Sequence, residues 1–346
     1  MRRFLLIILM LFAFSSRVYA QELTVPTVPE RAEKFMPSNG DNFAEGLLEV
    51  LRDVLMYIRP DIREAAAVCF KIIALMMLVS LLSATRGSAP NSVNLASSVG
   101  VALILLESSN SLINLAIETI TQISEYGKLL LPVMTAALAG QGGVSTSATL
   151  YTGTALFDAI LTAIIGKILK PMIFLFLFLA IASSAIGDDR LLKLRDTIKW
   201  FMTWSLKTIL YIYTGYIGIT GVVSGSTDAA ALKAAKLTIS SVVPIVGGIL
   251  SDASEAVLVG AGTVKNAAGI YGLFAIIALW IEPFMLIGIH YLFLKAAVSV
   301  CAVFSSKSSI SLIQDFTTAM GLLLAMTGSI CLMLLISLVC FFRGVG

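Results

Sequence analysis

Long apolar segments follow one another along this 346-residue chain from residue 65 to its C-terminal end. Most are continuous and about 20 residues long, the length at which an α-helix crosses the hydrocarbon core of a bilayer. Their apolar residues do not alternate with polar ones at every second position, so the pattern disfavours a transmembrane β-barrel. Only 13% of the residues are charged, against about 25% in soluble domains, and the sequence therefore predicts an all-α, polytopic helical membrane protein. The expected spans cover 65–84, 93–117, 148–166, 171–187, 203–223, 267–281 with 283–304, and 318–342.

The N-terminus is typical of a secretory signal peptide. Two arginines, Arg2 and Arg3, precede an apolar core at 4–14, and Val18-Tyr19-Ala20 supplies a small-residue cleavage site. The alternative is an uncleaved first span, but an apolar core of this length is short for a crossing. We therefore expect residues 1–20 to be a signal peptide and residue 21 to begin outside the cytoplasm.

Residues 21–64 agree with that placement, because they carry nine acids and five bases and cytoplasmic loops favour Lys and Arg. Their first part, which contains three prolines, is expected to be an irregular linker. From Phe43 to Pro60 the apolar residues fall on one helical face and the charged residues on the other. This amphipathic helix is expected to lie on the membrane surface, on a partner, or on the protein's own membrane domain, which we expect to cover residues 65–346.

Two pairs of prolines suggest that the membrane domain contains an internal repeat. Pro132 and Pro244 are 112 residues apart, and each is followed 39 residues later by another proline, Pro171 or Pro283. Glycine-rich tracts lie between the members of each pair. Corresponding Gly- and Pro-interrupted apolar segments in two halves of a membrane protein point to a substrate path. The pattern predicts two repeat-like halves, at about 129–225 and 241–344.

Each half is expected to open with a short broken helix. The apolar pieces at 129–140 and 242–250 begin at the paired prolines and are shorter than a full span, which is typical of half-helices or re-entrant segments. If 129–140 crosses the bilayer, each half has four crossings and the repeats run parallel; if it is re-entrant, each half has three and they are inverted. The charged stretch at 188–199 is expected to form an interfacial helix on the cytoplasmic side.

Enzyme signatures are missing from the sequence. The chain has one histidine, His290, and its four cysteines are scattered through apolar runs without metal or redox spacing. It contains neither a Walker A sequence nor a G-x-S-x-G elbow. We therefore expect a protein that is not an enzyme and binds no cofactor and no metal.

Several ionisable residues interrupt the apolar runs, where charge is costly and marks candidate functional sites. Glu282, next to Pro283, is the least easily explained, and we expect it to be protonated, paired or exposed to water. Glu282 and His290 are eight residues apart and would share a face of a regular helix, so a proton relay is an alternative to simple packing. The others are Lys71, Glu107, Asp158, Lys207 and Lys295.

Short motifs lie at and after the paired prolines: LPVMTAAL at 131–138, VPIVGG at 243–248 and VKNAAGI at 264–270. In this order and spacing they resemble the stage III sporulation protein AE family of endospore-forming Firmicutes, and the signal-like start, acidic segment and apolar remainder are similar too. The resemblance marks positions that we expect to be architectural or pathway-lining, as we also expect of Glu282. They are Pro132, Gly142, Gly143, Pro244, Gly247, Gly248, Asp252, Lys265, Asn266 and Gly269.

The resemblance implies a non-enzymatic, multi-pass component of the channel or secretion-like complex that joins mother cell and forespore. It implies a location in the mother-cell membrane around the forespore and a requirement for endospore formation and late forespore gene expression. Its implied partners are membrane lipid, other membrane proteins of the same sporulation complex, a secretion-type ATPase system and a forespore membrane partner, but no nucleic acid. The alternative is a proton-coupled secondary transporter with paired half-helices around its substrate.

Overall fold

The described part of the chain is built from helices, which confirms the all-α prediction. The computed structural model describes residues 26–38, 43–85, 90–140, 144–219 and 267–343. Five of its helical segments are long and apolar enough to cross a membrane: Arg59–Leu82, Leu95–Gly140, Ser147–Ile186, Gly269–Cys301 and Lys307–Phe341. The elements are α2 (Glu30–Glu33), α3 (Phe43–Tyr57), α4 (Arg59–Thr85), α5 (Pro90–Gly140), α6 (Val144–Ile164), the π-helical turn η1 (Ile165–Leu169), α7 (Lys170–Ile186), α8 (Asp189–Ile219), α11 (Ala267–Cys301) and α12 (Lys307–Arg343).

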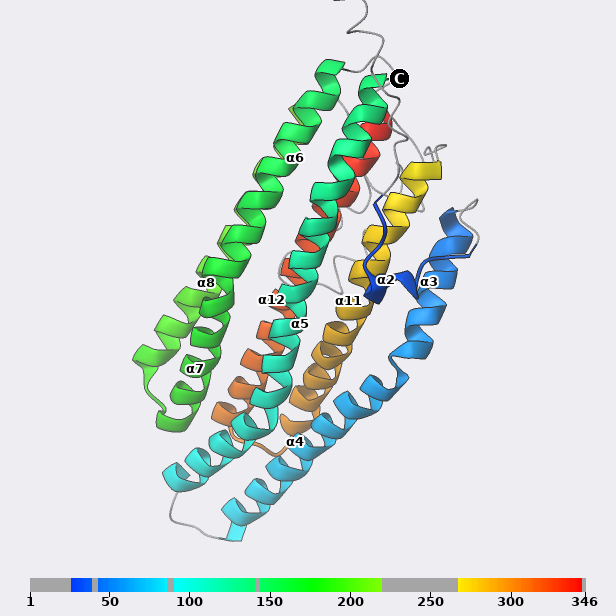
Figure 1. Cartoon of the computed structure of the whole chain (residues 1–346). Helices are drawn as coiled ribbons and strands as arrows, with labels where there is room; N and C mark the ends of the chain where they lie inside the picture. The colour runs from blue at the N-terminus through cyan, green and yellow to red at the C-terminus, as the bar shows by residue number, and fades with distance from the viewer. Residues whose placement is uncertain (1–25, 39–42, 86–89, 141–143, 220–266, 344–346) are drawn as a thin grey trace, which may run out of the picture.

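The helices form one elongated bundle around α12 (Figure 1). Helix α12 contacts α5, α6, α7, α8 and α11, and its most apolar stretch is entirely buried. In α4, on the outside of the bundle, only 22% of the corresponding stretch is buried. The bundle therefore shields one apolar helix from its surroundings and leaves apolar faces of the outer helices open.

The end of α4, the start of α5 and the connections α7–α8 and α11–α12 lie together at one end of the bundle, which we call the base (Figure 1). Helices α3 and α11 begin at the opposite end. At the base, Gly187 has a φ of 75°, a left-handed conformation that glycine adopts without a Cβ penalty, and it lets α7 turn into α8. The charged stretch at 188–199 is not a separate interfacial helix, because it forms the first third of α8, a helix that continues to Ile219.

The prolines do not break the helices as the sequence suggested. Pro132 lies inside the continuous α5 and Pro283 inside the continuous α11, so the expectation of a separate half-helix at 129–140 is wrong. Pro171 is the second residue of α7, just after the π-helical turn η1. A proline ring clashes with the carbonyl four residues earlier in an α-helix, here that of Lys167, and the wider π-turn gives it room. The second short piece, 242–250, lies outside the described residues.

The amphipathic helix α3 packs on the protein's own bundle, which was one of the three expected arrangements. Its buried residues Val50 and Val54 belong to the main hydrophobic core, and Phe43 stacks on Phe274 of α11 with ring centroids 5.3 Å apart. The helix ends at Tyr57, and Pro60 falls in the first turn of α4, where its missing N–H costs no intrahelical hydrogen bond.

Helices α6 and α8 approach each other closely at Gly153. A Cβ atom at this position would overlap the ring of Tyr216, whose hydroxyl donates a hydrogen bond to the Thr149 carbonyl at 2.7 Å. We expect Gly153→Ala to lower the free energy of unfolding in detergent micelles by about 1–3 kcal/mol, because the ring must move and give up that bond. Gly166→Ala is the matched control, since nothing lies within 4 Å of its Cβ position; an equal loss there would contradict the packing explanation.

Candidate functional site

Glu282 forms an ion pair with a residue from the far N-terminal part of the chain. Its side chain is 10% exposed, and its Oε2 accepts a hydrogen bond from Nε of Arg31 at 3.2 Å. The guanidinium Nη1 of Arg31 also lies 3.9 Å from Oε1 of Glu118, whose side chain is 60% exposed. The buried carboxylate beside Pro283 is therefore paired, which was one of the three states expected for it.

The segment that carries Arg31 is part of the hydrophobic core. Val28, Ala32 and Phe35 are buried in it, and Phe35 packs edge-on against Tyr57 of α3 with ring centroids 5.5 Å apart. Lys34 places its Nζ 3.5 Å from the centroid of the same Tyr57 ring, a cation–π contact. The irregular linker expected here is thus, in its described part at 26–38, a docked segment that contains the short helix α2.

Figure 1 shows α2 lying against the bundle between α11 and α3. The backbone carbonyl of Pro26 accepts a hydrogen bond from the Tyr126 hydroxyl of α5 at 3.5 Å. Together with the Arg31 contacts, this places residues 26–31 alongside α5, from Tyr126 to Glu118. No local sequence pattern indicated this docking, because Arg31 and Glu282 are separated by 251 positions.

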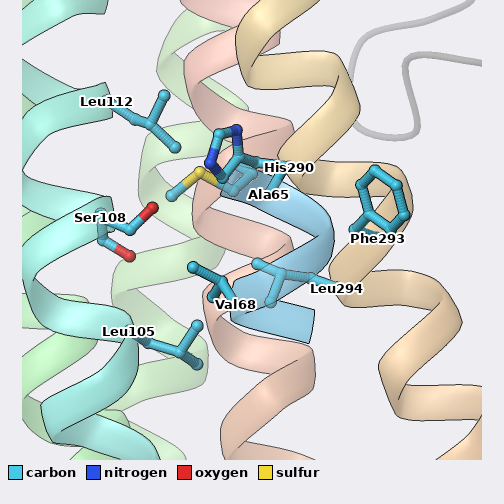
Figure 2. Close-up of a pocket in the computed structure, with 10 residues that line it drawn as sticks. Ala65, Val68, Leu105, Ser108, Leu112, His290, Phe293 and Leu294 are labelled. Carbon is cyan, nitrogen blue, oxygen red and sulfur yellow. The ribbon is translucent and has the colours of Figure 1, made fainter. Parts of the chain in front are cut away.

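Beside His290 the bundle has a small pocket between α4, α5, α11 and α12, shown in Figure 2. His290 and Ser108 of α5 lie across this pocket from each other, with Leu112 and Ala65 nearby. Its volume of about 10 Å³ has room for about one water molecule. The Nδ1 atom of His290 lies 3.0 Å from the Leu286 carbonyl, and among the described residues no hydrogen bond joins His290 to Glu282. The structure therefore gives no support to the relay alternative.

A second buried ion pair lies toward the base, between α8 and α12. Nη1 of Arg195 donates to Oδ2 of Asp315 at 2.6 Å, and the two side chains are 12% and 10% exposed. The same nitrogen donates to Ser311 Oγ at 3.2 Å. The sequence pattern marked the charged stretch at 188–199 but could not indicate Asp315 as a partner, since that pairing depends on α8 and α12 being neighbours.

Asp158 of α6 is buried in the seam with α5. Its Oδ2 accepts a hydrogen bond from Ser124 at 2.6 Å, while Oδ1 has no partner among the described residues. One turn earlier, Thr154 bonds Ser337 of α12 at 2.7 Å, and Ser337 also bonds Tyr213 of α8. These hydroxyl contacts join three helices within the apolar core, as interhelical hydrogen bonds do in membrane proteins.

Serine clusters join the helices at the base. Ser98 of α5 bonds Ser184 of α7 at 2.8 Å, and Ser184 bonds Ser308 of α12 at 3.1 Å. Beside them, Ser97 bonds Ser309 at 2.9 Å. Small hydroxyl side chains at these positions allow close helix contact and satisfy one another, so they are packing elements.

Most residues marked by the family resemblance cannot be placed. Pro132 is exposed on α5, and Gly269 is buried in the first turn of α11. Near them, Gly272 of α11 faces Leu130 of α5, whose Cδ2 would lie 3.2 Å from an added Cβ. The others lie outside the described residues: Gly142, Gly143, Pro244, Gly247, Gly248, Asp252, Lys265 and Asn266. Within the described ranges, no three His, Cys, Asp or Glu side chains gather as metal ligands would.

A bundle with five apolar helices of membrane-spanning length and paired buried charges defines a polytopic, all-α membrane protein. The sequence model of the stage III sporulation protein AE family matches residues 33–343, and the chain belongs to this family. It is 26% identical over 181 residues to stage III sporulation protein AE of Bacillus subtilis (strain 168). That match covers 52% of this chain and 45% of the relative, so the chain spans about half the length of the relative it matches. No solved structure matches the chain.

Proposed function

We propose that this chain is a non-enzymatic membrane component of the channel or secretion-like complex between mother cell and forespore. Membership of the stage III sporulation protein AE family supports a role in sporulation, and the spans support a multi-pass membrane location. In this proposal the protein lies in the mother-cell membrane around the forespore and is needed for late forespore gene expression. It acts there with other sporulation membrane proteins, a secretion-type ATPase system and a forespore membrane partner.

The Arg31–Glu282 ion pair is the observation that favours an assembly component over a proton-coupled transporter. A coupling carboxylate must exchange its proton with water or with a relay, whereas Glu282 is buried and held at 3.2 Å by a guanidinium. A guanidinium stays protonated at every physiological pH, so Arg31 remains a cationic hydrogen-bond donor to Glu282. Glu282 therefore serves to hold the N-terminal segment on the bundle.

The proposed orientation places residues 26–38 outside the mother-cell cytoplasm and the base inside it. The signal-like N-terminus supports this, and so do the bases at 190–199, which the structure places at the base end of α8. The docked segment then stabilises the bundle from the side that faces the forespore. A segment held on that side suits a protein that must meet partners between the two membranes.

Two single substitutions test the proposal in sporulating cells. Both Glu282→Gln and Arg31→Gln remove the ion pair, and we expect both to lower late forespore reporter activity to a similar, incomplete extent. Reporter activity is normalised to the amount of membrane-inserted protein. Glu118→Gln is the matched control and should have little effect, because this carboxylate is 60% exposed and 3.9 Å from Arg31.

A transporter predicts a different pattern. Its coupling carboxylate would be essential and the arginine dispensable, so Glu282→Gln would abolish activity while Arg31→Gln kept it. That result, with both proteins present at normal amounts in the membrane, would overturn the proposed function.

A further inference from the structure

The helices of this bundle are longer than a bilayer requires. Helix α5 has 51 residues and α12 has 37, which correspond to about 77 and 55 Å at 1.5 Å per residue. A bilayer is about 45 Å thick even with its headgroups. Observed tilts of up to about 40° would still leave about 59 Å of a straight α5 along the membrane normal. Some of the bundle must therefore lie beyond the membrane.

The exposed face of α5 changes character along the helix. Near the base its exposed side chains are apolar: Leu95, Val99, Leu103 and Leu106 are 41–69% exposed. From residue 107 to 128 every exposed side chain is polar or charged: Glu107, Asn110, Ser111, Asn114, Glu118, Thr121, Glu125 and Lys128. Such a face cannot lie against lipid, because charged and amide groups in hydrocarbon are costly.

The neighbouring helices also carry charged side chains level with the polar face of α5. Arg31 contacts both Glu118 and Glu282, which aligns this part of α5 with the middle of α11. The Cys69 thiol donates to the Phe293 carbonyl at 3.3 Å; α4 and α11 both run toward the base, so Glu282 is level with the start of α4. There Arg59, Arg63 and Glu64 are exposed. Charged groups thus surround this side of the bundle at one height.

Closer to the base than Lys71 and Glu107, the exposed side chains of α4, α5 and α7 are apolar over about the thickness of the hydrocarbon core. Helix α8, which packs beside α7, exposes Lys193, Asp196 and Lys199 in addition to apolar side chains. Helix α7 runs 17 residues from Lys170 to Ile186, about 26 Å, with charged residues directly beyond it at Asp188 and Asp189. Its Phe178 is 67% exposed, and on α4 Met77 is 57% exposed. We call this part, which contains α7, the base halves of α4, α5, α8 and α11 and the start of α12, the membrane tier.

We propose that only the membrane tier lies in the bilayer and that the rest of the bundle stands in water as an extramembrane helical head. This head comprises α2, α3, α6, the second half of α5 and the ends of α8, α11 and α12 nearest to them. The 21 residues of α6 give the head a height of about 30 Å. The inference holds whether or not the proposed function does; with it, the head projects into the space between the two membranes.

In the head, α11 and α12 bury their apolar residues as the core helices of a water-soluble domain do. The apolar stretch of α12 is wholly buried and 67% of that of α11 is buried, so their hydropathy does not require lipid. Helix α6 distinguishes the two possible heights of the bilayer. On its outer face Tyr151, Leu156 and Ile160 are 38–55% exposed. A bilayer that reached this height would place that face in lipid, while the polar face of α5 would be in contact with water.

Nitroxide accessibility measures this directly. Single cysteines are introduced at Asn114 and Glu125 on α5, at Thr152 on the outer face of α6, and at Met77 and Phe178 in the membrane tier. The background lacks Cys69, Cys301, Cys331 and Cys340, which are all buried. Each spin-labelled full-length protein is reconstituted in liposomes and relaxed with a water-soluble nickel chelate or with oxygen, which concentrates in lipid.

We expect the labels at Asn114, Glu125 and Thr152 to be several-fold more accessible to the nickel chelate than those at Met77 and Phe178. The membrane-tier labels should be relaxed mainly by oxygen. If the label at Thr152 were relaxed mainly by oxygen while the α5 labels were accessible to the nickel chelate, the polar face of α5 would line a hydrophilic path inside the bilayer. That result would overturn the proposal. Lipid-like responses at Asn114 and Glu125 would overturn it as well.

Discussion

Replacing Arg195 by methionine should destabilise the protein more than any other single change at its charged sites. The substitution leaves Asp315, whose side chain is 10% exposed, buried without its cation. Removing one partner of a buried ion pair costs about 3–5 kcal/mol, because the remaining charge loses its compensation. We expect a loss of that size in the free energy of unfolding, measured by denaturant titration in detergent micelles.

The chain supplies a matched control on the same guanidinium. Nη2 of Arg195 lies 2.9 Å from Oδ1 of Asp196, whose side chain is 62% exposed. Asp196→Asn should cost less than about 1 kcal/mol, since exposed ion pairs contribute little. If Arg195→Met and Asp196→Asn cost the same, the buried pair between α8 and α12 does not have the role assigned to it.

Phe35→Ala should release the N-terminal segment from the bundle. The side chain of Phe35 is 2% exposed and packs on Tyr57, and truncating a buried phenylalanine costs about 3–5 kcal/mol. Phe35 is the largest buried side chain of the segment, and the other buried ones, Val28 and Ala32, are small, so the loss should appear as local release. We expect faster cleavage by protease between residues 26 and 43, while the remaining helices stay resistant.

Leu48→Ala on α3 provides the comparison, because Leu48 is 67% exposed and its truncation should change stability by less than about 0.5 kcal/mol. Equal protease resistance of wild type and Phe35→Ala would mean that the segment is held by other contacts.

The helical class and much of the helix placement could be predicted from sequence because they depend on local pattern. Continuous apolar runs predicted the five apolar segments of membrane-spanning length, although the runs at 148–166 and 171–187 form one continuous segment and 203–223 is not among the five. The spacing of Val50 and Val54 predicted the face of α3 that the structure buries. Glu282 was correctly singled out as a charge that needs a special environment. These inferences use only the chemistry of neighbouring residues and the periodicity of the helix.

The continuity of the helices could not be predicted in the same way. Pro132 and Pro283 were interpreted as breaks, yet both lie inside long helices. Within a bundle, neighbouring helices and local adjustments compensate for the hydrogen bond that a proline removes. At Pro171 the adjustment is the turn η1. A proline in an apolar run therefore indicates a local distortion and does not decide between a kink and an end.

The partners of the buried charges also could not be predicted from the sequence. Glu282 pairs with Arg31 across 251 positions and Arg195 with Asp315 across 120, and each pairing depends on which helices become neighbours. The N-terminal segment was expected to be a linker because of its prolines, and a short segment that contributes three buried side chains carries too little pattern to predict its docking.

Exchanging the charges of Arg31 and Glu282 tests most directly whether Glu282 acts through its ion pair with Arg31. The double variant Arg31→Glu/Glu282→Arg keeps an ion pair between α2 and α11 with its polarity reversed. Late forespore reporter activity, normalised to membrane-inserted protein, should be low in each single variant and substantially recovered in the double variant. A double variant as inactive as Glu282→Arg alone, at normal membrane levels, would contradict the account and favour a carboxylate needed for its own chemistry.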